Sequence, residues 1–188
     1  FRRSRGLGDV YKRQMRAKGF MLGGTAGRTT LNGEGLQHQD GHSLLNAMAF
    51  PTVRAYDPAF NYETAVLIFD GLKKMYGEGE TAIYYIMVGN ENYAMAEMPE
   101  GSEEGIVKGM YRFRSRDVKN AKGRVQLFGS GAILNGVLKA QEILADQYKV
   151  ASDVWSVTSY TQLRREADDV RQWNVPVSYT HLRAHETS

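Results

Sequence analysis

Residues 27–43 concentrate the side chains of this sequence that could carry chemistry. The stretch is rich in glycine and contains Glu34, His38, Asp40 and His42. Glycine lets a backbone approach a bound molecule closely, and loops held by a rigid scaffold often carry function. Histidine exchanges protons near neutral pH, and a nearby carboxylate can orient it or tune its protonation. The composition of this stretch therefore fits one wall of an active centre.

Three interpretations of this segment compete. In the first, His38 or His42 carries a proton for a polar substrate, and the carboxylates orient it. In the second, Glu34, His38, Asp40 and His42 bind a metal ion, but no further ligands can be identified elsewhere in the chain. In the third, the same groups are scaffold that caps nearby helices. Spacing alone does not favour function over scaffold, because structural polar clusters are also common.

The two ends of the chain distort its bulk properties. Residues 4–14 and residues 177–186 can be encoded by the two strands of one short DNA element, as expected of a sequencing adapter translated at both ends. We therefore expect residues 1–14 and 175–188 to be non-native and leave them out of the fold prediction. His181 and His185 have the spacing of a helical metal pair, but they fall in the second of these ends.

The positive charge of the chain also comes from its ends. The net charge is +3, yet the first 14 residues carry five Lys or Arg against one Asp, and the last 14 carry one Arg and one Glu. Residues 15–174 then hold 18 basic and 19 acidic residues. This balance argues against a nucleic acid or an anionic membrane as a partner. No cysteine and no long apolar run are present, which excludes disulfides and fits a cytoplasmic protein.

Alternating strand and helix patterns predict an α/β fold with mostly parallel sheets. Asp57 and Pro58 are typical of a helix start, and Gly77 of a helix end. The turn Gly129–Gly131 lacks a complete phosphate-binding motif, so we interpret it as a tight connection between a strand and a helix. Residues 20–43 are predicted to form a loop and residues 91–104 a linker. We expect strands at 52–56, 81–88, 124–129 and 154–157, and helices at 57–76, 102–111, 130–148 and 160–173.

The string from Gly27 to Ser43 resembles the homodimeric bacterial pyruvate dehydrogenase family, the decarboxylating component of its complex. The resemblance extends over residues 15–174, and one departure is Gln39, where the family often carries an acid. Further strings that carry it lie at 55–60, 70–77, 90–93, 98–101, 126–134 and 152–159.

The resemblance implies a transketolase-like fold that binds thiamine diphosphate. Residues 15–98 would form the latter part of the pyrimidine-binding domain, and residues 99–174 a linker and the start of the C-terminal domain. Thiamine diphosphate and Mg²⁺ would be the cofactors, with their main ligands outside this stretch. The chain would then be an internal fragment, inactive alone, of an enzyme whose sites lie between two identical subunits.

The resemblance also implies an activity and site residues. The reaction would be oxidative decarboxylation of pyruvate, followed by transfer of the two-carbon unit to a lipoyl group on a dihydrolipoamide acetyltransferase partner. By residue match, His38 and Glu34 would be catalytic: His38 as proton donor or hydrogen-bond partner to a substrate oxygen, and Glu34 as its orienting group. Asp40 and His42 are candidates only by adjacency. The alternatives are a related 2-oxoacid dehydrogenase, another transketolase-family enzyme, or a non-catalytic dimerisation module.

Overall fold

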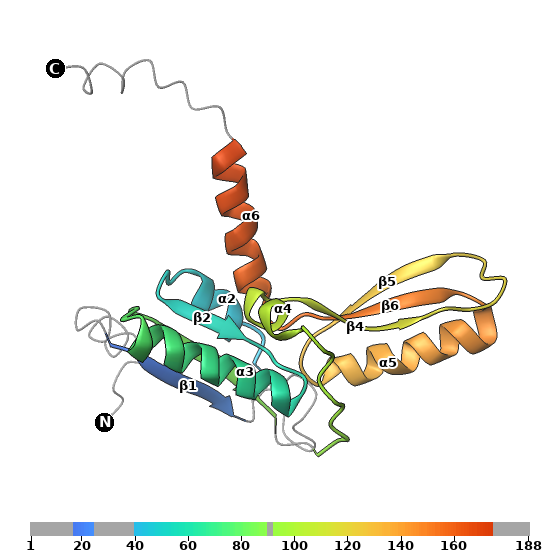
Figure 1. The fold of residues 1–188 in the computed structure, drawn as a ribbon, viewed down its shortest axis with the longest axis horizontal. Coiled ribbons are helices and arrows are strands. Elements are labelled where there is room, and N and C mark those ends of the chain that lie inside the picture. Colours follow the sequence, from blue (N-terminus) through green and yellow to red (C-terminus); the bar gives the residue numbers. More distant parts are fainter. Residues whose placement is uncertain (1–16, 25–39, 90–91, 175–188) are drawn as a thin grey trace.

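The computed structural model describes residues 17–24, 40–89 and 92–174, and contains two three-stranded sheets (Figure 1). The first sheet has the order β1-β3-β2, with all pairs parallel. In the second sheet, of order β4-β6-β5, β5 and β6 are parallel and β4 is antiparallel to β6. The strands are β1(Gly19–Gly24), β2(Val53–Tyr56), β3(Ile83–Val88), β4(Tyr111–Arg116), β5(Arg124–Gly129) and β6(Ala151–Ser156).

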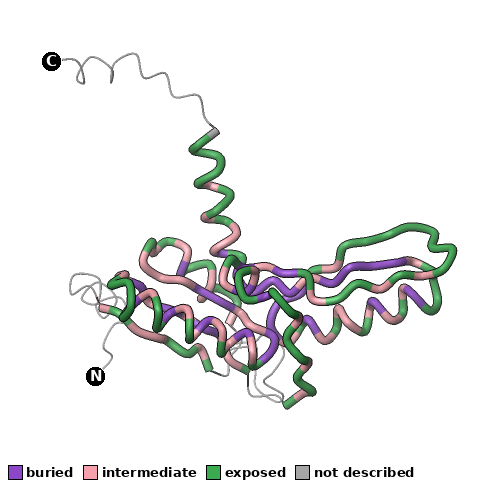
Figure 2. Tube along the Cα trace, viewed as in Figure 1, coloured by how far each residue is buried: buried purple, intermediate pink, exposed green. Residues whose placement is uncertain are grey.

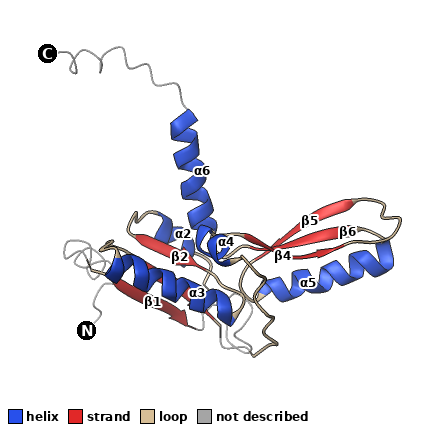
Figure 3. Cartoon of the chain, viewed as in Figure 1, coloured by secondary structure: helices blue, strands red, loops and turns tan. Residues whose placement is uncertain are grey.

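Helices cover these sheets unequally. Figure 3 shows α3 lying along the first sheet, α5 along the second, and α6 projecting away from both. We call the first sheet with α2 and α3 the first unit, and the second sheet with α5 the second unit. Both α3 and α5 end in a π-helical turn. The helical elements are α2(Ser43–Met48), α3(Asn61–Leu72), η2(Lys73–Gly77), α4(Glu103–Lys108), α5(Ile133–Ile143), η3(Leu144–Tyr148) and α6(Tyr160–Asn174). Within the described residues, no helix combines the length and apolar character needed to cross a bilayer.

Most of the predicted elements are confirmed. Strands β2, β3 and β5 lie where apolar or alternating runs predicted them, and the α/β class with mostly parallel sheets holds. Helices α4, α5 and α6 also form at the predicted places, and residues 92–102 contain no regular element.

Several boundaries were predicted wrongly. Residues 20–43 are not all loop, because β1 forms at their start and α2 begins at Ser43. Helix α3 starts at Asn61 rather than at Asp57, because the backbone of Asp57 bonds to the second unit instead. Strand β4 was missed, and β6 begins three residues before the predicted Val154.

The main core runs from the first unit into the segment that follows it. Tyr56 and Tyr84 stack with ring centroids 5.9 Å apart, and both are fully buried. Figure 2 shows a largely buried stretch along β6 toward the start of α6. Ile106 of α4 and Tyr111 of β4 pack into the same cluster. Burying a large apolar side chain contributes about 1.5–3 kcal/mol, so this shared core favours a fixed arrangement of the two units.

Buried hydrogen bonds reinforce the same contact. The carbonyl oxygen of Ala55 accepts bonds from Ser159 Oγ at 2.5 Å and Thr161 Oγ1 at 3.0 Å. Thr158 Oγ1 donates to the carbonyl of Ile106 at 2.7 Å. The end of β2 is thereby tied to the segment between β6 and α6 and to the first turn of α6, where the two units meet.

Candidate functional site

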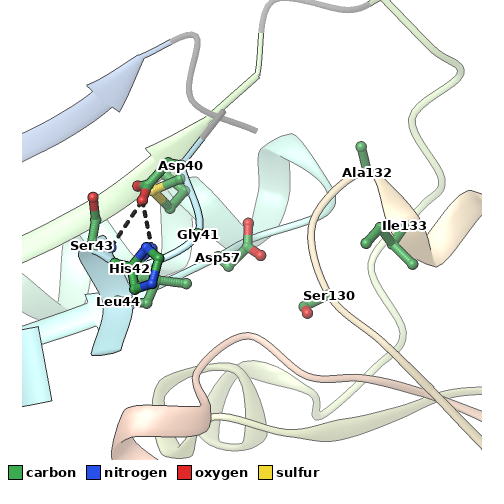
Figure 4. Close-up of a pocket in the computed structure, with 10 residues that line it drawn as sticks. Asp40, Gly41, His42, Ser43, Leu44, Asp57, Ser130, Ala132 and Ile133 are labelled. Carbon is green, nitrogen blue, oxygen red and sulfur yellow. Dashed lines mark hydrogen bonds between the residues drawn. The ribbon is translucent and has the colours of Figure 1, made fainter. Parts of the chain in front are cut away.

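A small cavity lies between the two units (Figure 4). One wall is the segment Asp40–Leu44, which leads into α2, and the facing wall is the turn Ser130–Ile133, which leads from β5 into α5. Asp57, at the end of β2, and Met87 of β3 complete the lining. The end of residues 27–43, which we call the histidine-rich segment, thus lies against a turn almost 90 residues later in the sequence.

Asp40 builds the first wall. Its Oδ1 accepts the backbone N–H of His42 at 3.0 Å and that of Ser43 at 2.9 Å, the two bonds drawn in Figure 4. These are amides at the start of α2, where a helix lacks internal acceptors. His42 is exposed and makes no capping bond with its side chain. Asp40 therefore has the scaffold role that the third interpretation of the segment predicts.

Asp57 builds the junction with the second wall. Its backbone N–H donates to the carbonyl of Thr158 at 2.7 Å, and its carbonyl accepts the N–H of Gly131 at 3.1 Å. Its carboxylate lies against Gly131, since a Cβ atom added there would stand 2.5 Å from Asp57 Oδ1. The sequence suggested a helix cap at Asp57, whereas the structure gives it a contact between units.

Tyr85 was not predicted as a site residue. Its side chain lies near Ser43 and Asp40, and the pKa of its phenol is raised, first by burial and further by the carboxylates of Asp40 and Asp57. The phenol therefore stays protonated at neutral pH and can donate to a carboxylate. In the sequence Tyr85 is one of two adjacent tyrosines in an apolar strand, so core packing was the natural interpretation.

Glu34 and His38, the predicted catalytic pair, lie outside the described residues. The cavity lined by Asp40–Leu44, which follow them in the sequence, has a volume of about 30 Å³. It has room for only one or two water molecules. Among residues 17–24, 40–89 and 92–174, no group of three acidic, histidine or cysteine side chains could hold a metal ion. This cavity is therefore too small for thiamine diphosphate, and the described residues offer no group of three side chains for Mg²⁺.

We expect Gly131→Ala to destabilise the chain by about 1–3 kcal/mol. Gly131 has a φ of +52°, which disfavours a side chain, and the new Cβ would collide with the Asp57 carboxylate. Gly136→Ala is the control: it lies within α5 with open space around it, so it should stabilise by about 0.5–1 kcal/mol. Urea unfolding of both variants measures the difference. Equal effects would show that the Gly131 contact does not constrain the turn.

Comparisons with known proteins agree with this architecture. A family described as "Pyruvate dehydrogenase E1 component middle domain" matches residues 2–96, and a "Transketolase-like TK C-terminal domain" matches residues 109–186. The chain belongs to the pyruvate dehydrogenase E1 component family. The Escherichia coli pyruvate dehydrogenase E1 component is 56% identical over 160 residues, covering 85% of this chain and 18% of the relative. The relative from Cupriavidus necator is 54% identical over 162 residues, covering 86% and 18%.

The chain thus spans about a fifth of the length of its E1 relatives. Solved transketolases share its fold. The Campylobacter jejuni enzyme aligns with a TM-score of 0.59 and 17% identity over 84% of this chain and 24% of its own. A Pichia stipitis transketolase aligns with a TM-score of 0.56 and 18% identity over 81% and 21%. At these identities the likeness establishes the transketolase-like fold, and the family assignment rests on the E1 relatives.

Proposed function

We propose that this chain is part of a thiamine-diphosphate-dependent enzyme that oxidatively decarboxylates pyruvate and passes the acetyl unit to a lipoyl group. The observation that carries the proposal is the 56% identity to an E1 component over 160 residues. The position of Asp40–Ser43 supports it, because these residues end the histidine-rich segment and line the cavity between the units.

In this proposal His38 and Glu34 are the catalytic side chains supplied by the chain. His38 would donate a proton or a hydrogen bond to a substrate oxygen, and Glu34 would orient it. Thiamine diphosphate, when bound, supplies the electron sink. The residues that bind it and Mg²⁺ would come from parts of the enzyme that this chain does not include.

The proposed partners are a second identical subunit and a lipoyl-bearing dihydrolipoamide acetyltransferase, in the cytoplasm. Asp40, through its bonds to the start of α2, would hold the end of the catalytic loop in place. The chain by itself would be inactive, because it would lack the cofactor ligands.

A chimera tests the proposal. Its host is the Escherichia coli E1 component, in which the 160 matching residues are replaced by those of this chain. We expect the chimera, with thiamine diphosphate and Mg²⁺, to release carbon dioxide from pyruvate and to acetylate a lipoyl domain, while the 188-residue chain alone does neither. A folded chimera that binds the cofactor but prefers another 2-oxoacid or a ketose would favour the alternative enzymes. A folded chimera without activity would favour a non-catalytic module.

A further inference from the structure

Glu63 is a fully buried carboxylate in the first turn of α3, with a relative exposure of 0%. Among the described residues it forms no ion pair, and its partners are four hydrogen-bond donors. Oε2 accepts the backbone N–H of Ala59 and that of Phe60, the latter at 3.1 Å. Oε1 accepts Tyr111 Oη and Ser156 Oγ, each at 2.6 Å. Burying a carboxylate is costly unless it is well bonded, and these four bonds offset that cost.

The four donors come from both units. Ala59 and Phe60 precede α3 in the first unit, whereas Tyr111 begins β4 and Ser156 ends β6 in the second. The Tyr111 hydroxyl also lies 2.5 Å from that of Tyr62. Burial and the neighbouring Glu63 carboxylate raise the pKa of Tyr111, which keeps its phenol protonated as a donor. Glu63 is therefore a polar tie across the junction of the two units.

Backbone bonds connect this tie to the second wall of the cavity and to Asp57, which completes its lining. The residue after Ser156, Val157, donates its N–H to the carbonyl of Gly129 at 2.7 Å, next to the turn that forms the second wall. The following carbonyl, that of Thr158, accepts the N–H of Asp57. A shift of Ser156 relative to Glu63 would therefore displace the Ser130–Ile133 turn from Asp57 and from the Asp40–Leu44 wall.

We propose that Glu63 is a positioning residue for the candidate site: through Ser156 and Tyr111 it sets the separation of the two cavity walls. Because Glu63 is fully buried and does not line the cavity, it acts without touching the substrate. The functional part of this inference rests on the proposed decarboxylation of pyruvate.

Strand β6 offers a matched pair of serines for the test. Ser156 and Ser152 are both fully buried on the same strand. Ser156 Oγ donates to Glu63, whereas Ser152 Oγ has no hydrogen-bond partner among the residues that the structure describes. Ser156→Ala removes one donor of the tie, and Ser152→Ala makes the same chemical change at a position outside it. Glu63→Gln removes the charge while keeping an amide oxygen for the backbone donors.

The first measurement is hydrogen exchange in the 188-residue chain, read at the amides of Asp57, Gly131 and Val157. Each of these amides donates across or beside the junction. We expect Ser156→Ala and Glu63→Gln to speed their exchange by about tenfold, the loss equivalent to one ordinary hydrogen bond, and Ser152→Ala to leave it unchanged. Equal exchange in the Ser156 and Ser152 variants would overturn the proposal.

The second measurement is steady-state kinetics in the chimera. Ser156→Ala and Glu63→Gln should raise the KM for pyruvate by about tenfold with kcat little changed, because the walls are displaced while the reacting groups remain. Faster exchange with an unaltered KM would mean that Glu63 only fastens the units, which overturns the positioning role. If the chimera with the native segment is inactive, the proposed function fails. Exchange in the chain then decides separately whether Glu63 holds the walls together.

Discussion

Glu63→Leu should lower the free energy of unfolding of the 188-residue chain by about 3–6 kcal/mol, because it leaves several buried donors without an acceptor. The amides of Ala59 and Phe60 are fixed by the backbone and cannot turn elsewhere. The Tyr111 hydroxyl can still use its neighbour Tyr62. Since each buried, unbonded donor costs about 1–3 kcal/mol, the loss approaches the whole stability of an ordinary domain.

Glu63→Gln separates the charge from the hydrogen bonds. The glutamine oxygen can accept both backbone amides, and its NH₂ group can donate to the Tyr111 and Ser156 hydroxyls after these rotate. These neutral bonds are weaker than the bonds to a carboxylate, so the variant still loosens the junction. We therefore expect a loss well below that of Glu63→Leu. Glu142→Leu, on the exposed side of α5, is the matched control and should change stability by less than about 0.5 kcal/mol. Urea unfolding compares the three variants, and a Glu63→Leu effect no larger than the control would show that the buried bonds carry no net stability.

The sequence predicts best the elements whose burial follows from their own residues. The run that became β3 is apolar throughout, so a buried strand was the direct interpretation. Strand β6 was placed too late because Ser152 and Asp153, near its start, are polar residues typical of a surface. In the structure Asp153 is largely buried and accepts bonds from Ser115, Gln126 and Arg124. The partners that make its burial possible lie on neighbouring strands, and no local pattern reveals them.

Strand β4 was missed for a related reason. Its sequence, Tyr111–Arg116, carries three arginines, and the ladder with β6 is irregular between Arg112 and Arg114. Arg114 bonds to Gln141, a buried side chain of α5. A charged strand of this kind is stable only because the second sheet and α5 supply partners. These partners are far away in the sequence, so the residues of the strand alone do not reveal it.

The candidate site also contains a part that the sequence predicted and a part that only the structure reveals. The density of titratable groups pointed to residues 27–43, and the structure brings the end of that segment, Asp40–Ser43, to the cavity between the units. Tyr85, Asp57 and Ser130 could not be assigned to the site from sequence, because each is a plausible core, cap or turn residue where it stands. Their common location depends on the contact between two units separated by many residues in the chain.

His38→Gln in the chimera should lower kcat for pyruvate decarboxylation by about 10²–10⁴-fold, the usual contribution of a general acid or base. Glutamine is close to histidine in size and polarity but cannot exchange a proton near neutral pH. Because the proposed role is in proton transfer rather than in binding, kcat should fall more than KM rises. Decarboxylation and lipoyl acetylation, measured separately, then show which half of the reaction needs the proton.

His42→Gln is the control for this prediction, since it makes the same replacement four residues along the same segment. His42 lines the cavity, yet the capping of α2 uses its backbone N–H and not its imidazole. We therefore expect a loss in kcat below the lower end of the His38 range. If His38→Gln leaves both half-reactions unchanged, the catalytic assignment is wrong. If His42→Gln gives the larger loss, the proton carrier is His42, the other histidine that spacing alone had left open.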